Sequence, residues 1–211
     1  MDNSFVTIGY YICDKTESPS YLEFDTESFI SVSDCLCDHE PQIVYCHGWK
    51  PHGDDPEYIH RYFADKEEYI KMSVEIWELF SHNLFSMDGR FLHKKDAVYF
   101  YNTYFAAYDC TLVTVSTKER YSELSSDNSD KKEYERSEAE GRFIGCDIIG
   151  WDISGFHSFM CNSLHKEFDD ISFNKYGLLD ESFEKAEKMA EKIHGMGEPV
   201  DWIPVMIYKL Y

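Results

Sequence analysis

The chain lacks any apolar run approaching the roughly 20 residues that a helix needs to cross a bilayer. Its start, Met1-Asp2-Asn3-Ser4, carries no basic residue, and no apolar segment of signal-peptide length follows it. The seven cysteines are an odd number and do not follow the regular spacing of a secreted disulfide framework. These absences predict a cytoplasmic protein whose cysteines are buried free thiols.

Motifs that identify common enzymes are also missing. The sequence contains no phosphate-binding glycine loop, no dinucleotide-binding glycine pattern, no His-Glu-x-x-His and no nucleophile elbow. Basic residues are few, because 20 Lys and Arg face 40 Asp and Glu, which gives a net charge of −20. Such a charge repels nucleic acid and anionic lipid. The sequence therefore predicts no nucleic-acid partner, no membrane partner and no cofactor, and it gives no reason to assign an enzyme.

The acidic charge is unevenly distributed. Residues 1–60 hold twelve acidic residues but only two basic ones, Lys15 and Lys50. An acidic surface attracts cationic partners and raises the rate at which they associate. Acidity also improves solubility without any partner, and this simpler interpretation stays open.

Large apolar side chains are abundant, with 43% hydrophobic and 17% aromatic residues. A chain of 211 residues with this supply is expected to form a hydrophobic core without a disulfide or a metal. Apolar patterning predicts strands at 5–13, 42–46, 143–149 and 200–211, and helices within 56–85, 156–168 and 182–193.

Two further features refine these elements. Residues 97–115 are predicted to form two strands, with a helix over 97–108 as the alternative. Pro204 places the last strand at a sheet edge or a bulge, because proline donates no ladder hydrogen bond. Strands and helices alternate without a regular βαβ repeat, so the predicted class is α+β. We expect one compact domain, 1–211, with a mixed or antiparallel sheet packed by about three helices.

The stretch 121–141 contains almost no apolar residue to bury. It is predicted to be a mobile polar loop. Seven acidic and three basic residues give it a net charge of only −4. Most of the acidic charge is therefore expected on the folded parts of the chain.

Potential metal ligands are densest in one cluster. Cys35, Cys37 and His39 are followed by Cys46 and His52. Thiolate and imidazole groups are the ligands that zinc prefers, but the common sites use C-x₂₋₄-C rather than C-x-C, and no second pair follows. The spacing therefore predicts no metal site, although convergence of these side chains stays open.

A second cluster offers acid–base chemistry. Asp147, Asp152 and His157 lie near the predicted junction of a strand and a helix. Two carboxylates and an imidazole serve a metal-assisted hydrolase if they converge. The alternative is structural: Asp152 forms the turn and caps the helix, and His157 is a surface or packing residue.

Aromatic residues interleaved with acids indicate a partner-binding surface. Rigid aromatic anchors beside steering charges are typical of protein interfaces. Some of these rings, Tyr69 above all, have a core position as the alternative. The residues predicted to bind the partner are Trp49, Asp54, Asp55, Glu57, Tyr58 and Tyr62.

In size, acidity, aromatic content and free cysteines, the chain resembles the small acidic immunity proteins of contact-dependent and other polymorphic toxin systems. That resemblance implies a cytoplasmic inhibitor that neutralises a basic toxin, such as a nuclease, by covering its active-site cleft. The physical argument agrees, because a nuclease is basic where it holds nucleic acid and an acidic inhibitor gains speed and specificity from complementary charge.

Overall fold

A computed structural model describes residues 4–15, 28–32, 44, 62–86, 88–122, 139–152, 155–160, 163–180, 182–197 and 200–211. The predicted strand 42–46 lies outside these residues except for Val44, which is buried. The polar loop predicted at 121–141 also lies outside them over 123–138. The remaining elements form one compact α+β domain built on an antiparallel sheet, as the sequence predicts.

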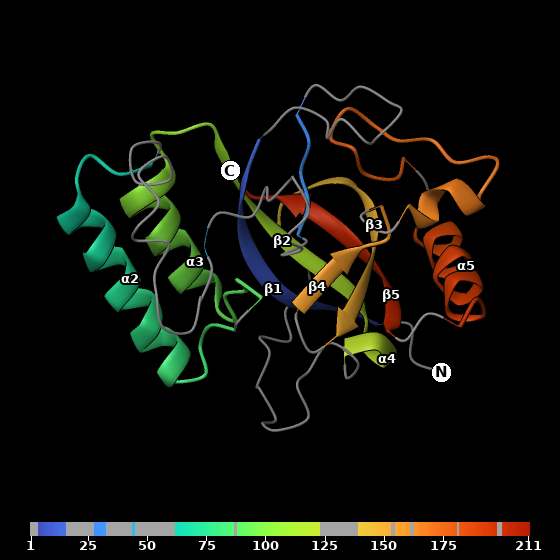
Figure 1. The fold of residues 1–211 in the computed structure, drawn as a ribbon, viewed down its shortest axis with the longest axis horizontal. Coiled ribbons are helices and arrows are strands. Elements are labelled where there is room, and N and C mark those ends of the chain that lie inside the picture. The colour runs from blue at the N-terminus through green and yellow to red at the C-terminus, as the bar shows by residue number, and fades with distance from the viewer. Residues whose placement is uncertain are drawn as a thin grey trace.

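The sheet has the order β1-β2-β5-β3-β4, and every neighbouring pair runs antiparallel. Its strands are β1 (Phe5–Asp14), β2 (Cys110–Lys118), β3 (Arg142–Asp152), β4 (Gly155–Ser158) and β5 (Asp201–Lys209). The sheet curls on itself in the middle of the molecule (Figure 1). Long runs of β-branched and aromatic residues explain these strands, because such side chains pack well on a pleated surface.

Helices lie at both ends of the long axis, outside the curled sheet. At one end are α2 (Lys66–Ser81) and α3 (Lys94–Phe100), the latter continued by a π-helical segment, Tyr101–Phe105. At the other end lie α5 (Phe183–His194) and the 3-10 helix η2 (Leu164–Glu167), as Figure 1 shows. The short α4 (Glu119–Ser122) directly follows β2.

The core has three layers of buried side chains. One layer joins α2 and α3 to β1 and β2 through residues such as Met72, Phe100 and Ile12. The second fills the inside of the curled sheet, and the third joins β3 and β5 to α5. Because alternate residues of a strand face opposite sides, β3 contributes Ile149 to the inner layer and Ile148 to the α5 layer.

Three predicted elements are wrong in the structure. Residues 97–105 are helical rather than a strand, which is the alternative that the sequence left open. Residues 156–168 form β4, a turn and η2 rather than one helix, because β4 pairs with β3 and completes the sheet. Pro204 lies in a central strand, but the β2 pairing of β5 runs only over 206–209, so the missing proline N–H costs no bond on that side.

The boundary of the predicted polar loop is also too early. Tyr121 belongs to α4 and packs against two of the core layers. Its hydroxyl donates a hydrogen bond to Glu187 on α5, at 3.1 Å. Lys118 and Arg120 also bind Glu187, at 2.9 and 2.6 Å. This network joins the end of β2 to α5.

Candidate functional site

The predicted partner-binding residues lie mostly outside the described chain. Only Tyr62 can be placed, and its predicted exposure is wrong: 4% of its surface is accessible. Its hydroxyl donates to Asp14 at 2.5 Å, and its ring meets Phe105 edge-on, with centroids 6.0 Å apart. Tyr69 is also buried, on the inner face of α2. Tyr69 is buried because it shares the inner face of α2 with Met72 and Ile76. Tyr62 precedes that helix and is buried through its contacts with Asp14 and Phe105.

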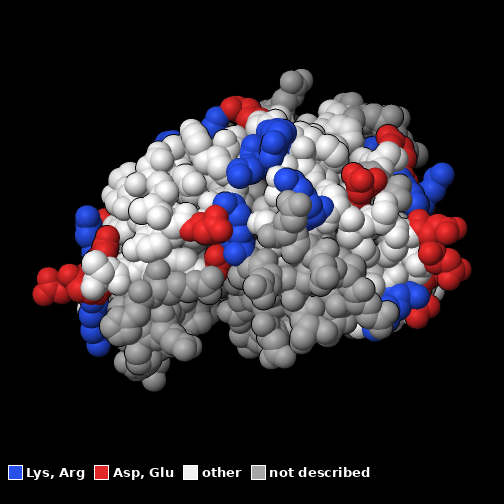
Figure 2. Space-filling model, turned by 90° about the horizontal axis from the view of Figure 1, so that it is seen from above, with Lys and Arg blue, Asp and Glu red and all other residues white. Residues whose placement is uncertain are grey.

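The acidic charge is only partly on the described residues. They carry 21 acidic and 15 basic side chains, a net of −6 out of the −20 of the whole chain. Figure 2 shows Lys and Arg side chains near the middle of one face, with Asp and Glu beside them and at the two ends. On the face shown, acidic and basic residues are mixed among the coloured side chains. Local charge must therefore be examined element by element.

The hydrolase alternative fails on geometry for two of its residues. Ser158 of β4 lies opposite Ile149 of β3, and its hydroxyl donates to Asp147 at 3.1 Å. Asp147 and Ser158 therefore share one face of the sheet. His157, the next residue on β4, points to the opposite face. Asp147 and His157 cannot act together on one substrate.

Asp152 is the last residue of β3 and pairs with Gly155 of β4, so the predicted cap of a following helix is wrong because a strand follows it. In the described part of the chain, no group of three His, Cys, Asp or Glu side chains is arranged to hold a metal. The cluster Cys35, Cys37, His39, Cys46 and His52 lies outside that part. Cys13, Cys110 and Cys146 are buried free thiols, as predicted.

Asp147 is nevertheless an unusual carboxylate. It is 1% exposed, and one oxygen accepts bonds from the Ile148 N–H at 2.7 Å and from Ser158. The other oxygen, Oδ2, is buried and has no hydrogen-bond partner among the residues that the structure describes. Burial raises the pKa of Asp147 from 3.8 to about 7, although both hydrogen bonds oppose the shift. The residue is enclosed in the core, so this raised pKa affects stability rather than a substrate.

A second buried carboxylate, Asp88, is paired with a cation. Arg90 lies beside it with Nε 3.3 Å from Oδ2, and the Tyr11 hydroxyl donates to the same oxygen at 3.0 Å. Ser86 also donates to Asp88. Arg90 packs over Gly9, where a Cβ atom would lie 2.2 Å from its Cγ. This arrangement is structural, since all of its members are buried.

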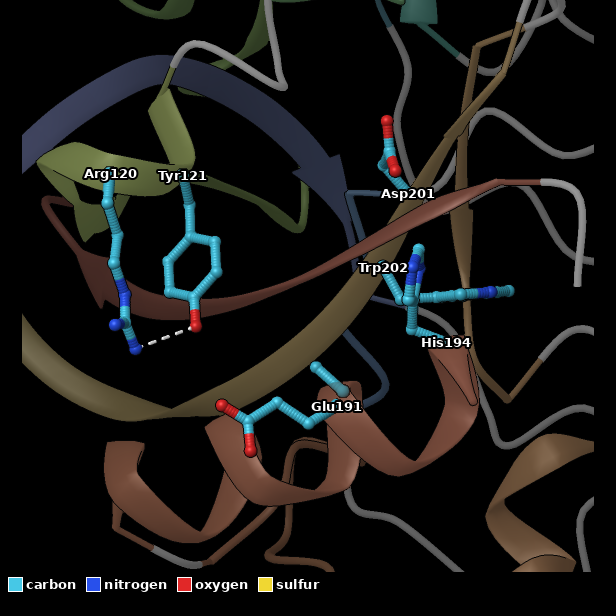
Figure 3. A pocket seen from close by; sticks show the side chains of 7 residues that line it. Arg120, Tyr121, Glu191, His194, Asp201 and Trp202 are labelled. Atoms are coloured by element: carbon cyan, nitrogen blue, oxygen red, sulfur yellow. Dashed lines mark hydrogen bonds between the residues drawn. The ribbon is translucent and has the colours of Figure 1, made fainter. Parts of the chain in front are cut away.

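A pocket of about 460 Å³ lies between α4, α5 and the start of β5. In Figure 3, Arg120 and Tyr121 border one side, with Glu191, His194, Asp201 and Trp202 around the rest. Arg120 is already bound to Glu187, which raises the pKa of its guanidinium. Glu191 and Asp201 bring the opposite charge, so the lining favours neither an anion nor a cation.

The outer face of α2 is the surface that the sequence analysis missed. Three large apolar side chains are exposed on it: Ile70 at 47%, Val74 at 53% and Trp77 at 42%. They recur at i, i+4 and i+7, so they form one stripe on the side opposite the buried Tyr69, Met72 and Ile76. The signal was present in the sequence, because a helix with two apolar stripes has one more than its core requires.

Comparisons with family models, with curated proteins and with solved structures found no match for this chain. None of the helices in the described ranges has the length and apolar character that crossing a membrane requires. The residues themselves therefore carry the functional argument.

Proposed function

We propose that this protein is an acidic inhibitor that binds a basic protein partner, in the manner of an immunity protein that neutralises a toxin nuclease by covering its cleft. The observation that carries the proposal is the exposed apolar stripe of α2, in a chain with a net charge of −20. An apolar surface rimmed by charge is typical of a protein interface rather than of a catalytic centre. The cytoplasm, where toxin nucleases act, is the proposed location.

Charge supports the choice of a basic partner. Residues 1–60 carry a net charge of −10. α2 and its N-cap Asp65 together hold five acidic residues and two basic ones, Lys66 and Lys71. A nuclease cleft is basic because it binds phosphates. An acidic surface therefore accelerates the encounter and discriminates against acidic proteins.

The test is capture of a partner from native lysate with the whole chain as bait, followed by association kinetics with the purified partner. We expect a basic protein whose association slows between about 0.01 M and 0.15 M ionic strength, because salt screens steering charges. Reversing the charges of Asp54, Asp55 and Glu57 together should lower the on-rate. Trp49→Ala removes an aromatic anchor, so it should weaken the binding free energy by roughly 2 kcal/mol, chiefly through a faster off-rate. Capture of no basic protein, or association that ignores salt, would contradict the proposal.

A further inference from the structure

Exposed apolar side chains concentrate at the α2 end of the molecule. Four of the eight large apolar side chains that are exposed in the described residues lie there: Ile70, Val74 and Trp77 on α2, and Tyr99 on α3. The Tyr99 hydroxyl donates to Glu75 of α2 at 3.1 Å, which brings Tyr99 beside that helix. Glu75 lies about 100° around the helix from Val74, so Tyr99 flanks the stripe rather than extending it. We call Ile70, Val74 and Trp77 the α2 docking face.

The docking face has the shape of a helical ridge. From Ile70 to Trp77 the stripe runs about 10 Å along α2, or two turns. Side chains spaced four and three residues apart pack into the groove of a second helix. The Trp77 ring is supported from one side by Phe80, with centroids 5.4 Å apart. A supported aromatic ring loses little conformational freedom when a partner covers it.

The charge around the docking face is negative, above all at the C-terminal end of α2. A helix C-terminus carries partial negative charge, which basic residues in the last turn usually offset. The last turn of α2 has no basic residue and begins with the acidic Glu78. Glu75 lies one turn earlier, where its carboxylate is 3.9 Å from Lys71 Nζ and accepts the hydrogen bond from Tyr99. Helix dipole and carboxylates thus add at one end of the apolar stripe.

We infer that the α2 docking face binds an amphipathic helix whose apolar side covers Ile70, Val74 and Trp77, and whose basic rim lies against Glu75, Glu78 and the C-terminal end of α2. This inference rests on the proposed function and names the element through which the basic partner binds. The apolar stripe supplies the buried area, and the negative end of α2 sets the direction in which the basic rim lies.

A synthetic helix provides a defined probe. The peptide has about 18 residues, five turns, with leucine on one face and lysine on the other, and its binding to the full chain is measured by fluorescence anisotropy. A second peptide has the same composition in scrambled order, so it keeps the charge and loses the apolar face. We expect saturable binding of the amphipathic peptide. The scrambled peptide should bind with an affinity at least about tenfold lower.

Variants locate the binding. Ile70→Ser with Val74→Ser should weaken the amphipathic peptide roughly tenfold or more, since two apolar contacts are lost. Met196→Ser is the matched control, because Met196 is 40% exposed beyond the end of α5, and it should leave binding unchanged. Glu75→Gln with Glu78→Gln should weaken binding at low ionic strength and have little effect at high ionic strength, whereas Glu191→Gln on α5 should have no effect.

Three outcomes would overturn the inference: no saturable binding, equal binding of the scrambled peptide, or an equal loss with Met196→Ser. Binding by a captured basic partner that ignores the Ile70/Val74 double variant would also overturn it, while leaving the proposed function intact. Conversely, if the peptide binds at the docking face but no basic partner is captured, the docking face stands and the proposed function fails.

Discussion

The two long helices, α2 and α5, differ in the face that each turns to solvent. Both bury an apolar stripe against the sheet. The exposed residues of α5 are charged or polar, namely Glu184, Lys188, Glu191, Lys192 and His194. Those of α2 include Ile70, Val74 and Trp77. The outer face of α5 is therefore polar, as expected of a helix whose outer side faces solvent, whereas the outer face of α2 carries an exposed apolar stripe.

The last turns of the two helices show the same contrast. Lys192 and His194 offset the negative end of α5, whereas the last turn of α2 has no basic residue. Lys192 also donates to the Glu167 backbone carbonyl at 2.6 Å, so it ties η2 to α5. The charges of α5 serve the fold of this chain. The charges of α2 are also partly engaged within the chain, because Asp65 caps the helix and Glu75 lies 3.9 Å from Lys71.

The largest effect should come from the buried stripes, where the helices are alike. Ile76→Ala in α2 and Ile193→Ala in α5 should each lower the free energy of unfolding by about 2 to 5 kcal/mol, because each leaves a cavity in a packed layer. Urea unfolding measures both. A loss below 1 kcal/mol for Ile76→Ala, with the full loss for Ile193→Ala, would mean that α2 packs less tightly on the sheet than α5 does.

The two buried carboxylates, Asp88 and Asp147, give the next largest effect. Asp88 is paired with Arg90, whereas no described cation pairs with Asp147 and burial raises its pKa to about 7. The folded state therefore holds a proton on Asp147 that the unfolded state releases above its ordinary pKa, so stability is full below about pH 4 and falls as pH rises through 7.

Asp147→Asn removes this dependence. Relative to the parent, the variant should gain up to about 4 kcal/mol of unfolding free energy between pH 4 and pH 8, because about three pKa units are involved. Urea unfolding of both proteins at several pH values measures the gain. A parallel pH profile in the two proteins would show that Asp147 is solvated rather than buried.

Removing a helix N-cap should have a smaller effect on stability, and the loss should be larger for α2 than for α5. The Asp65 carboxylate accepts the Glu68 N–H at 2.8 Å, whereas the Ser182 hydroxyl accepts the Lys185 N–H at 3.4 Å. Asp65→Ala should cost about 1 kcal/mol, and Ser182→Ala less, because a charged and shorter bond is stronger. Thermal unfolding of the two variants ranks them. The reverse order would mean that α5 depends more on its cap than its geometry indicates.

The smallest effect on stability should come from the docking face. Val74→Ser and Lys188→Ser, on the exposed sides of α2 and α5, should each change the unfolding free energy by less than about 0.5 kcal/mol. The same urea titrations measure this. A loss of more than 1 kcal/mol for Val74→Ser would show that Val74 supports the fold of the isolated chain.

The elements with clear local sequence patterns, such as β1 and α5, could be predicted from the sequence. β1 is rich in β-branched and aromatic residues, and its predicted range, 5–13, ends one residue before the strand does. α5 was predicted to end at Ile193, one residue early, with Asp180 or Ser182 as its cap, and the structure shows Ser182. The segments at 97–105 and 156–168 failed because their aromatic residues suit helix and strand alike, and pairing with β3 decided the second of them.

The candidate site was harder to predict from sequence. Which side of β4 His157 faces depends on the register with β3, and that register is set by the tertiary fold. Whether an apolar side chain such as Trp77 is covered depends on what packs around the helix, which spacing alone does not state. Tyr62 was assigned to the surface because acids surround it in sequence, but its partner Asp14 is 48 residues away.

The proposed function requires that a basic protein covers α2 rather than α5. The most direct measurement places a photo-crosslinking amino acid at Val74, or at Lys188 as the control, in the cell that makes the protein. We predict that illumination links position 74, and not position 188, to a basic protein, and that Glu75→Gln with Glu78→Gln reduces the yield. Equal crosslinking from both positions, or a product at position 188 alone, would contradict the account.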